Sequence, residues 1–539
     1  MHTIVFHGRS YRPRVALLLG VALLIAAIGV VSATGCGSSG TSGGSASSAS
    51  ASAASAPAFG GVVRYGISAP TTLDPHFTSN TPELKVTQQM YSWLTVLDSN
   101  NEPTPSVATA WEMSPDGKTW TFTIRSDVKF NDGSPLTVDD VVYSYDRMRD
   151  PKIGAATVTL LKAVKSVEAT DATHVVFHMN PGDAEFSKEV ADYHAAILSR
   201  NVKDPAKDFV GSGPFMIQKY VPEDRIIMVK NPYYWGKDDS GQQLPYLDGV
   251  TFIISPETGS LVDGLLGGQV DYVPDLSYEL AQKVKADPNM QLITGKTNWS
   301  LEVHLRCDKG HPAADPRIRK ALRMGTDYQG LIDLVRPGLA DVGNGTVVGP
   351  TYGAYYWDQA PAYDPEGAKK LLAEAGASDF TMKLYCITDF DAVGLATAWK
   401  EQMSKIGVTV NIQAVPGTVY YADSGDAAWL SCDFGVTDWA HRPVPVIYFD
   451  MSYVSDAPWP ESHWSDAEFD KTVAAIHGEL DATKRAELYY KAQQILWERG
   501  PVVMFCHEDS VAGAAGTLKG IMVPPDANQV QFAKVYFAK

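Results

Sequence analysis

The chain lacks the sequence patterns of the common catalytic sites. A phosphate-binding loop needs a glycine five residues before the glycine of its GK pair, and the GKT runs at 117–119 and 295–297 have none there. His507-Glu508 has no second histidine four residues after the first, and the GxSxG pattern of serine hydrolases does not occur after residue 58. We therefore expect a protein that is not an enzyme and has no metal and no cofactor. A secreted hydrolase is the least favoured alternative.

Cysteine is scarce, and its usual spacings are missing. The 539 residues include 5 cysteines, and the four that follow the N-terminal segment have no CxxC spacing. These four lie mostly in apolar strand-like runs: Cys307, Cys386, Cys432 and Cys506. Disulfides form outside the cytoplasm, but the spacing assigns no pairs, and small core residues are an equal alternative.

An excess of positive charge is also missing. The formal net charge is −17, and the first 36 residues carry three arginines and no acid, so the remainder is more acidic than the whole. Such a surface repels phosphate backbones, and we expect no nucleic-acid partner. With 45% hydrophobic residues the chain can bury a large core, and its length predicts two or three folded units.

The first 36 residues predict a secretion signal. Basic residues end at Arg14, an apolar run spans 15–31, and small residues follow up to Cys36. The run is short for a membrane helix, which needs roughly 20 apolar residues. ATGC at 33–36 resembles a bacterial lipobox, in which the cysteine is lipidated, although leucine is usual where Ala33 stands. An ordinary signal peptide and an uncleaved anchor are the alternatives.

Residues 37–58 form an uncharged run dominated by serine, glycine and alanine. Such a composition cannot repay the entropy of ordering, so it predicts a flexible tether with an end-to-end distance of roughly 25 Å. We therefore expect an extracytoplasmic body, lipid-anchored to the outer face of the cell membrane or periplasmic.

In the body, strand patterns alternate with helix patterns. Trp120, Phe122 and Ile124 alternate with polar residues in 119–130, as in a half-buried strand. The helix starts that we expect are Thr137 with Asp140, Asp315-Pro316, Asp364-Pro365 and Ser465 with Glu468. Apolar strand-like runs lie at 380–388, 408–415 and 429–436. The alternation favours an α/β fold.

Six stretches along the body carry a family resemblance. They are TTLDPHFTSN, AWEMSPDGKTWTFTIRSDVKFNDGSPLT, GSGPFMIQKYVPEDRIIMVKNPYYW, DPRIRKALRMGTDYQGLI, YDPEGAKKLLAEAG and WSDAEFDKTVAAIHGELDATKRAELYYKAQQILWERGPVVMF. In this order they resemble the extracytoplasmic solute-binding proteins of ABC importers, in solute-binding protein family 5, which includes dipeptide-, oligopeptide- and nickel-binding proteins. The second stretch is the most specific, and the resemblance covers most of 60–539.

The resemblance implies a two-lobed, periplasmic-binding-protein-like fold of class II, with α/β lobes and an extra subdomain on the first lobe. We expect lobe I at 59–297, with the extra subdomain at about 96–207, lobe II at 298–507, and a C-terminal return to lobe I at 508–539. The chain then crosses between the lobes twice, near Thr297 and near His507.

The resemblance also implies a function in transmembrane transport. Such a protein captures a small organic solute between its lobes and delivers it to the permease subunits of an ABC transporter, commonly in peptide transport. We expect a monomer that meets the membrane only through its lipid anchor. A membrane-tethered ligand sensor is an alternative that the sequence does not separate from an import receptor.

The run TDWAHRPVPVIYF at 437–449 is the candidate ligand site. It is either a surface loop or the lining of a polar cleft, because unpaired polar groups are costly in a core. In the peptide-binding relatives a stretch resembling W-x-A-D-Y-P-D-P stands here, and its first acid receives the ammonium group of the ligand. His441 replaces that acid and Arg442 its neighbour, although the spacing is one residue short and Asp438 can stand in after a one-residue slip.

These replacements predict a cleft with cationic donors. Arg442 is suited to bidentate capture of a carboxylate or phosphate. We therefore expect an anionic or polyhydroxylated compound, or a modified peptide, rather than an ordinary free-amine peptide. An oligopeptide and a nickel chelate are the alternative ligands, and a structural pairing of Arg442 with Asp433 or Asp438 is the alternative role of that side chain.

The remaining candidate residues lie on either side of the expected cleft. The loop after L-D-P-H supplies the neutral hydrogen-bonding residues Ser79, Asn80 and Thr81. Trp299 either stacks on the ligand or packs the hinge. The candidate set is completed by Thr437, Asp438 and Trp439.

Overall fold

The computed structural model describes residues 57–78, 80–155, 161–359, 362–422 and 427–539. The described residues, from 57 onward, belong to one compact unit. The expected signal segment with Cys36, nearly all of the expected tether at 37–58, and Ser79 lie outside the described residues.

One 11-stranded sheet runs through this unit. Two long antiparallel strands lie at its centre, β12 (Met290–Leu305) and β17 (Val502–Ala515). On the β12 side the sheet continues with β16 (Phe434–Trp439), β14 (Thr381–Ile387) and β15 (Thr409–Val415). On the β17 side it continues with β11 (Tyr272–Val273), β1 (Val62–Ile67), β10 (Gly249–Ile254), β9 (Arg225–Lys230) and β8 (Phe215–Val221), while β13 (Ala340–Asp341) pairs with β17 off this path.

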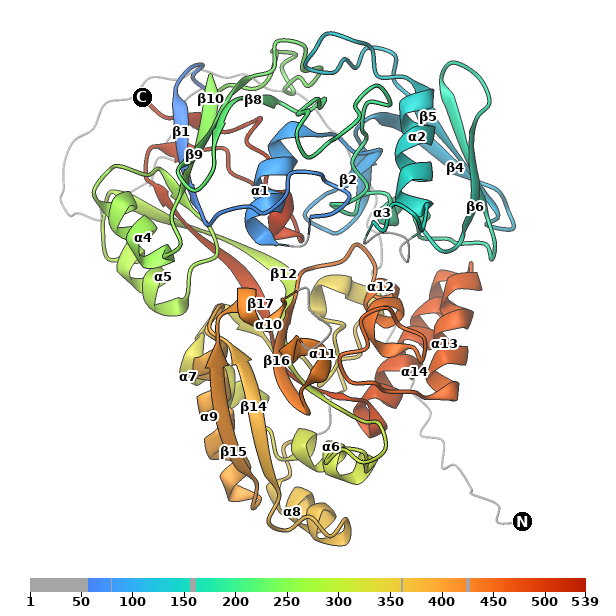
Figure 1. Cartoon of the computed structure of the whole chain (residues 1–539), viewed down its shortest axis with the longest axis vertical. Helices are drawn as coiled ribbons and strands as arrows, with labels where there is room; N and C mark the ends of the chain where they lie inside the picture. Colours follow the sequence, from blue (N-terminus) through green and yellow to red (C-terminus); the bar gives the residue numbers. More distant parts are fainter. Residues whose placement is uncertain (1–56, 79, 156–160, 360–361, 423–426) are drawn as a thin grey trace, which may run out of the picture. The chain divides into compact units, whose positions relative to one another are not determined.

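Separate hydrophobic cores divide the unit into two lobes, which β12 and β17 connect (Figure 1). We call first lobe the part around β1, β8, β9 and β10, and second lobe the part around β14, β15 and β16. The first lobe also holds a four-stranded sheet, β4 (Ala108–Met113), β5 (Thr119–Ile124), β7 (His174–Met179) and β6 (Val164–Ala169), and the hairpin β2 (Thr95–Leu97) with β3 (Pro103–Pro105). The expected two-lobed α/β fold is confirmed, and the expected lobe bounds stay a prediction.

Helices cover both lobes. Those of the first lobe are α1 (Thr81–Met90), α2 (Val138–Arg149), α3 (Phe186–Glu189), α4 (Thr258–Leu266) and α5 (Tyr278–Lys285). Those of the second lobe are α6 (Pro316–Met324), α7 (Tyr328–Val335), α8 (Pro365–Glu374), α9 (Ala392–Lys405), α10 (Gly417–Tyr420), α11 (Ala428–Ser431), α12 (Val446–Tyr448), α13 (Ala467–Gly478) and α14 (Ala482–Arg499).

Local sequence signals correctly predicted several of these elements. Trp120, Phe122 and Ile124 are the buried residues of β5, as the alternation predicts. Thr137 and Asp140 form a capping box at the start of α2. The carboxylates of Asp315 and Asp364 cap α6 and α8 by accepting backbone hydrogen bonds.

Two local expectations are wrong. Helix α13 is capped by Asp466 rather than Ser465, because the Asp466 carboxylate accepts from the backbone N–H of Glu468 and of Phe469, both at 3.0 Å. The run at 429–436 is not one strand, since its first residues close α11 and β16 begins only at Phe434. Short apolar runs do not distinguish a helical turn from a strand by periodicity alone.

Candidate functional site

The run at 437–449 is buried, so its interpretation as a surface loop is wrong. It begins as the end of β16 and continues through a turn into α12. His441 and Arg442, in that turn, are only 1% and 3% exposed. Both lie where the second lobe meets the first, and they contact residues of the other lobe.

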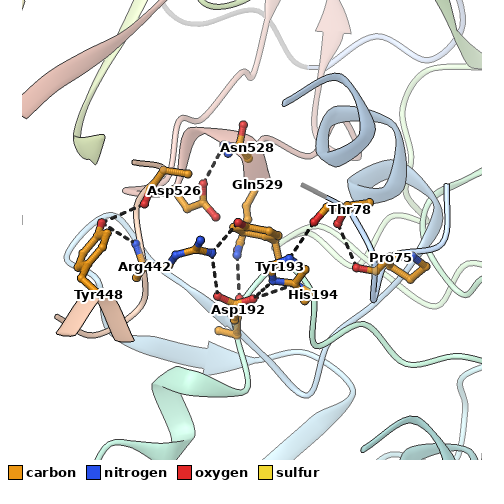
Figure 2. A network of polar contacts seen from close by, with 12 residues as sticks. Pro75, Thr78, Asp192, Tyr193, His194, Arg442, Tyr448, Asp526, Asn528 and Gln529 are labelled. Carbon is orange, nitrogen blue, oxygen red and sulfur yellow. Dashed lines mark hydrogen bonds and ion pairs between the residues drawn. The ribbon is translucent and has the colours of Figure 1, made fainter. Parts of the chain in front are cut away.

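Arg442 is held by a cluster of side chains from both lobes (Figure 2). Its Nη1 donates to the Tyr193 hydroxyl at 2.5 Å and lies 3.7 Å from the Asp192 carboxylate. Its backbone N–H donates to the Tyr448 hydroxyl at 3.1 Å, and its guanidinium lies over the rings of Tyr193 and Trp439. We call these residues the Arg442 cluster.

The alternative pairing of Arg442 with Asp433 or Asp438 is therefore wrong. Asp433 lies 2.6 Å from the His311 ring, and Asp438 accepts from the Tyr421 hydroxyl at 2.7 Å. The partner of Arg442 comes instead from the first lobe, which no local pattern around residue 442 indicates.

The charges of the Arg442 cluster are balanced. Burial alone would raise the pKa of Asp192, but His194 at 2.7 Å and the nearby Arg442 lower it below its ordinary value. Burial opposes the charge of Arg442, yet Tyr193 and Asp192 outweigh that effect and raise its pKa. Arg442 and Asp192 thus form a buried ion pair between the lobes.

His441 contributes a neutral ring, which corrects the expectation of a cationic pair. Burial, together with the charge of Arg442, lowers the pKa of His441 to about 3. Its Nε2 lies 3.0 Å from the Asn101 side-chain oxygen, and its ring stacks on Tyr352 with centroids 5.3 Å apart. Asn101, between β2 and β3, also donates to the Pro443 carbonyl at 2.9 Å. Nε2 therefore carries the proton, and Nδ1 is an acceptor.

Several buried polar atoms in and near the Arg442 cluster have no hydrogen-bond partner among the described residues. They are Nε of Arg442, Nε1 of Trp439, Nδ1 of His441, Oδ2 of Asp526 and both amide atoms of Asn528. Burial raises the pKa of Asp526 to about 7. Buried polar atoms are nearly always satisfied in native proteins, so this set of donors and acceptors indicates a place for a polar molecule.

The other predicted residues lie apart from this cluster. The Thr437 hydroxyl contacts Tyr420 at 3.0 Å inside the second lobe. Burial raises the pKa of Asp438 to about 6. Trp299 packs against Phe390, with ring centroids 5.0 Å apart, beside the crossing of β12 and β17.

The described part of the predicted ligand-binding loop in the first lobe leads into the start of helix α1. Asn80 forms a capping box with Glu83, and Thr81 is the first residue of α1. The structure therefore brings Trp439, His441 and Arg442 together, and it gives Asn80 and Thr81 a structural role. Asp192, Tyr193, Asp526 and Asn528 were missed, because none belongs to a recognisable motif.

A second polar contact joins the lobes at Glu185, which precedes α3. Its Oε1 accepts from the Tyr355 hydroxyl at 2.8 Å, and its Oε2 accepts from the Tyr489 hydroxyl at 3.1 Å. Arg485 lies 3.5 Å from Oε2 and donates to the Tyr355 hydroxyl at 3.1 Å. We call these four residues the Glu185 contact.

Two further observations concern the described part of the chain. No helix there is long and apolar enough to cross a membrane. No group of three or more His, Cys, Asp or Glu side chains in that part is arranged to hold a metal ion.

The sequence and the fold are similar to those of known binding proteins. A family model described as bacterial extracellular solute-binding proteins, family 5 Middle, matches residues 102–459. The glutathione-binding protein GsiB of Salmonella typhimurium is 27% identical over 480 residues, which are 85% of this chain and 90% of GsiB. The dipeptide-binding protein of Escherichia coli is 26% identical and covers 83% of this chain and 89% of its own length.

Solved structures share the fold. Helicobacter pylori DppA in complex with the peptide STSA has a TM-score of 0.77 and 23% identity, covering 89% of this chain and 99% of DppA. AgaA of A. tumefaciens R10, in complex with agropinic acid, has a TM-score of 0.77 and 22% identity, with the same coverage. Both are periplasmic binding proteins, as the two-lobed fold predicts.

Proposed function

Because the chain belongs to family 5 of the bacterial extracellular solute-binding proteins, we propose that it is a lipoprotein that captures an anionic or polyhydroxylated solute at Arg442. At the coarser level it is a solute-binding protein of an ABC importer for peptides or related ligands, and it is not an enzyme. Permease subunits of that importer are its expected partners, and we propose that it acts as a monomer.

The observation that carries the ligand proposal is the unpartnered Nε of the buried Arg442, taken over the described residues. Nη1 of this guanidinium is engaged by Tyr193, whereas Nε is a buried donor that remains for a solute. A charge-assisted hydrogen bond from it is stronger than a neutral one. The nearby Asp526 and Asn528 add acceptors and a donor that suit hydroxyl or amide groups.

Relatives support this range of ligands without fixing one. GsiB is named for glutathione, and AgaA was solved with agropinic acid. Both compounds carry carboxylates, in keeping with an anion-binding arginine. His441 and Arg442, in place of the acid that receives an ammonium group in peptide-binding relatives, disfavour an ordinary free-amine peptide at this position.

The anchor proposal rests on the sequence alone. Cys36 follows an apolar run and small residues, and an uncharged run separates it from the described body. We expect the mature chain to begin at a lipidated Cys36 and to remain with the membrane fraction. Mass spectrometry of its N-terminal peptide, with Cys36→Ser as the comparison, tests this, and an unmodified cysteine in the membrane-associated protein contradicts it.

Native mass spectrometry of the gently purified mature chain tests the ligand proposal. A closed protein retains its solute, and the identified compound is then titrated by calorimetry against wild type and Arg442→Ala. We expect at least a tenfold loss of affinity, since hydrogen bonds to charged groups are worth about 1.5–3 kcal/mol. Arg225→Ala, at an exposed ion pair with Asp224, is the matched control. If Arg442→Ala binds the identified compound with unchanged affinity, the Arg442 side chain is not part of the binding site.

A further inference from the structure

One of the four described cysteines contacts an acid–base pair inside the second lobe. All four are free, and the thiols of Cys307 and Cys386 donate to backbone carbonyls. The Sγ atom of Cys432 instead lies 3.5 Å from Nε2 of His304. On the other side of this ring, Nδ1 lies 3.2 Å from a carboxylate oxygen of Glu461. We call Cys432, His304 and Glu461 the Cys432 triad.

Several elements hold the Cys432 triad in place. Cys432 directly follows α11, and His304 is the next to last residue of β12, where it pairs with Gly435 of β16. A Cβ atom at Gly435 would lie 2.4 Å from Cε1 of His304 and 3.0 Å from Sγ of Cys432. A glycine inside a strand is typical of such a close approach. The Thr437 hydroxyl, 3.2 Å from Nδ1, contacts the ring on the same side as Glu461.

The His304 ring carries a positive charge. Burial opposes this charge, but Cys432 and Glu461 outweigh that effect and raise the pKa of His304 to about 10. The Tyr420 hydroxyl also faces the ring, 3.5 Å from Nδ1. Burial and the charge of Glu461 raise the pKa of the nearby Glu302 to about 8, so Glu302 is mostly neutral at neutral pH. Glu461 is therefore the carboxylate that orients the imidazolium.

Cys432 borders solvent and has a second cation beside it. Nη1 of Arg306 donates at 3.1 Å to the carbonyl of the exposed Ser431, the residue before Cys432. Cys432 is 8% exposed, whereas Cys386 and Cys506 are fully buried. The thiolate is the reactive form of a cysteine, and neighbouring cations favour it over the thiol. Cys432 therefore combines the surroundings of a reactive cysteine with access for a small reagent only.

The order of the groups in the Cys432 triad suits a reaction whose leaving group needs a proton. Activated nucleophiles have an acid–base group within hydrogen-bond reach, and a third group orients that one. His304 and Glu461 have these positions relative to Cys432. Hydrogen peroxide fits the restricted access because it is small, and the hydroxide that leaves it is stabilised when an imidazolium supplies a proton.

We propose that Cys432 is a modification site for hydrogen peroxide, which oxidises its thiol to a sulfenic acid with His304 as the proton donor. The thiolate sulfur attacks one peroxide oxygen, so an S–O bond forms while the O–O bond breaks. Sulfur is oxidised and keeps the attacked hydroxyl, and the peroxide is reduced. The other hydroxide takes the proton from Nε2 of His304 and leaves as water. This step modifies the chain once and does not involve the solute at Arg442.

The test treats the reduced mature chain with hydrogen peroxide and dimedone, which traps sulfenic acids, and locates the adduct by peptide mass spectrometry. Cys307 is more exposed than Cys432, but burial raises its pKa to about 11. Exposure alone therefore predicts the adduct at Cys307, whereas the Cys432 triad predicts it at Cys432. In His304→Gln we expect the rate at Cys432 to fall at least about 100-fold, because acid–base assistance contributes about 10²–10⁴-fold.

The pH profile separates proton donation by His304 from a merely structural role. Between about pH 6 and about pH 8 the wild-type rate should change little, while the rate of His304→Gln should rise about tenfold per pH unit as its thiol ionises. His174→Gln, at a partly exposed histidine, should behave as wild type. Glu461→Gln tests the positioning residue, should lower the rate less, and takes the place of His304→Gln if that variant does not fold.

The outcomes are distinct from those of the solute experiments. An adduct at Cys432 whose rate depends on His304 or Glu461 upholds the modification site, whatever Arg442→Ala does to solute binding. An adduct at Cys307 in place of Cys432, no adduct at either, or equal rates in His304→Gln and His174→Gln overturns it.

Discussion

The Arg442 cluster and the Glu185 contact are built from the same kinds of side chain, yet they differ in how many of their polar atoms have hydrogen-bond partners. Each joins the lobes through an arginine, a carboxylate and tyrosine hydroxyls. At Glu185 both carboxylate oxygens accept hydrogen bonds from the other lobe. At Arg442, Nε and the nearby Asp526 and Asn528 keep polar atoms without partners among the described residues.

This difference separates a contact that holds the lobes together from a cluster that recognises the solute. A contact whose polar atoms are satisfied contributes to closure of the lobes and has little left to offer a solute. A cluster with unused donors and acceptors gains most when a solute supplies the missing partners. We therefore expect changes at Glu185 to alter how tightly any solute is held, and changes at Arg442 to alter which solute is held.

Among the changes that test this difference, replacing Asp192 should have the largest effect, which is on the free energy of unfolding. In Asp192→Ala the buried Arg442 loses its ion-pair partner, and removing one member of a buried pair costs about 3–5 kcal/mol. Urea unfolding should show a free energy of unfolding lower by that amount, while Asp224→Ala, at an exposed pair, leaves it nearly unchanged. Equal midpoints for wild type and Asp192→Ala would mean that Arg442 is balanced by other groups.

The neutral His441 gives a pH dependence with a definite sign. Its pKa is about 3 in the folded chain and ordinarily near 6.5, so the unfolded chain binds its proton first as the pH falls. The free energy of unfolding then decreases below pH 6.5, at most by about 1.4 kcal/mol per pH unit from this group. His441→Phe should flatten the slope between pH 6.5 and 4, and His174→Gln, at a partly exposed histidine, should not.

Replacing Glu185 should have the smallest effect, which is on the apparent affinity for the solute. It tests whether Glu185 acts in closure of the lobes rather than in recognition. Glu185→Gln removes the charge that Arg485 and the two tyrosines engage, so closure weakens by about 1 kcal/mol, roughly fivefold in apparent affinity. Calorimetry against the co-purified solute and its chemical analogues should show the same factor for every compound. A factor that varies between compounds would place Glu185 in the recognition site.

The fold was predictable from local signals and family resemblance because both depend on residues close in sequence. The alternation in β5 and the capping residues Thr137, Asp315 and Asp364 act within a few residues of the elements that they define. The failure at 429–436 has the opposite cause, since a four-residue helix and a strand show the same apolar run there.

The site was only partly predictable because its partners are distant in sequence. Arg442 was identified as unusual from its neighbours, but its contacts with Asp192 and Tyr193 span about 250 residues of chain. The charge of His441 was misjudged because burial, which decides its protonation, does not follow from residue type. Asp526 and Asn528 offered no signal in the sequence.

The crossing of β12 and β17 has a consequence for the motion of the lobes. Between Gly295 and Trp299 the strand pairing slips, and side chains replace the ladder: the Thr297 hydroxyl donates to the Glu508 carbonyl at 2.6 Å, and the Asn298 amide donates to the Val347 carbonyl at 2.9 Å. We call this interruption of the strand pairing the seam. Bending at the seam need not break the regular hydrogen-bonded ladder on either side. Amide hydrogens of the ladder should therefore exchange slowly throughout an opening and closing cycle, with faster exchange confined to the seam itself.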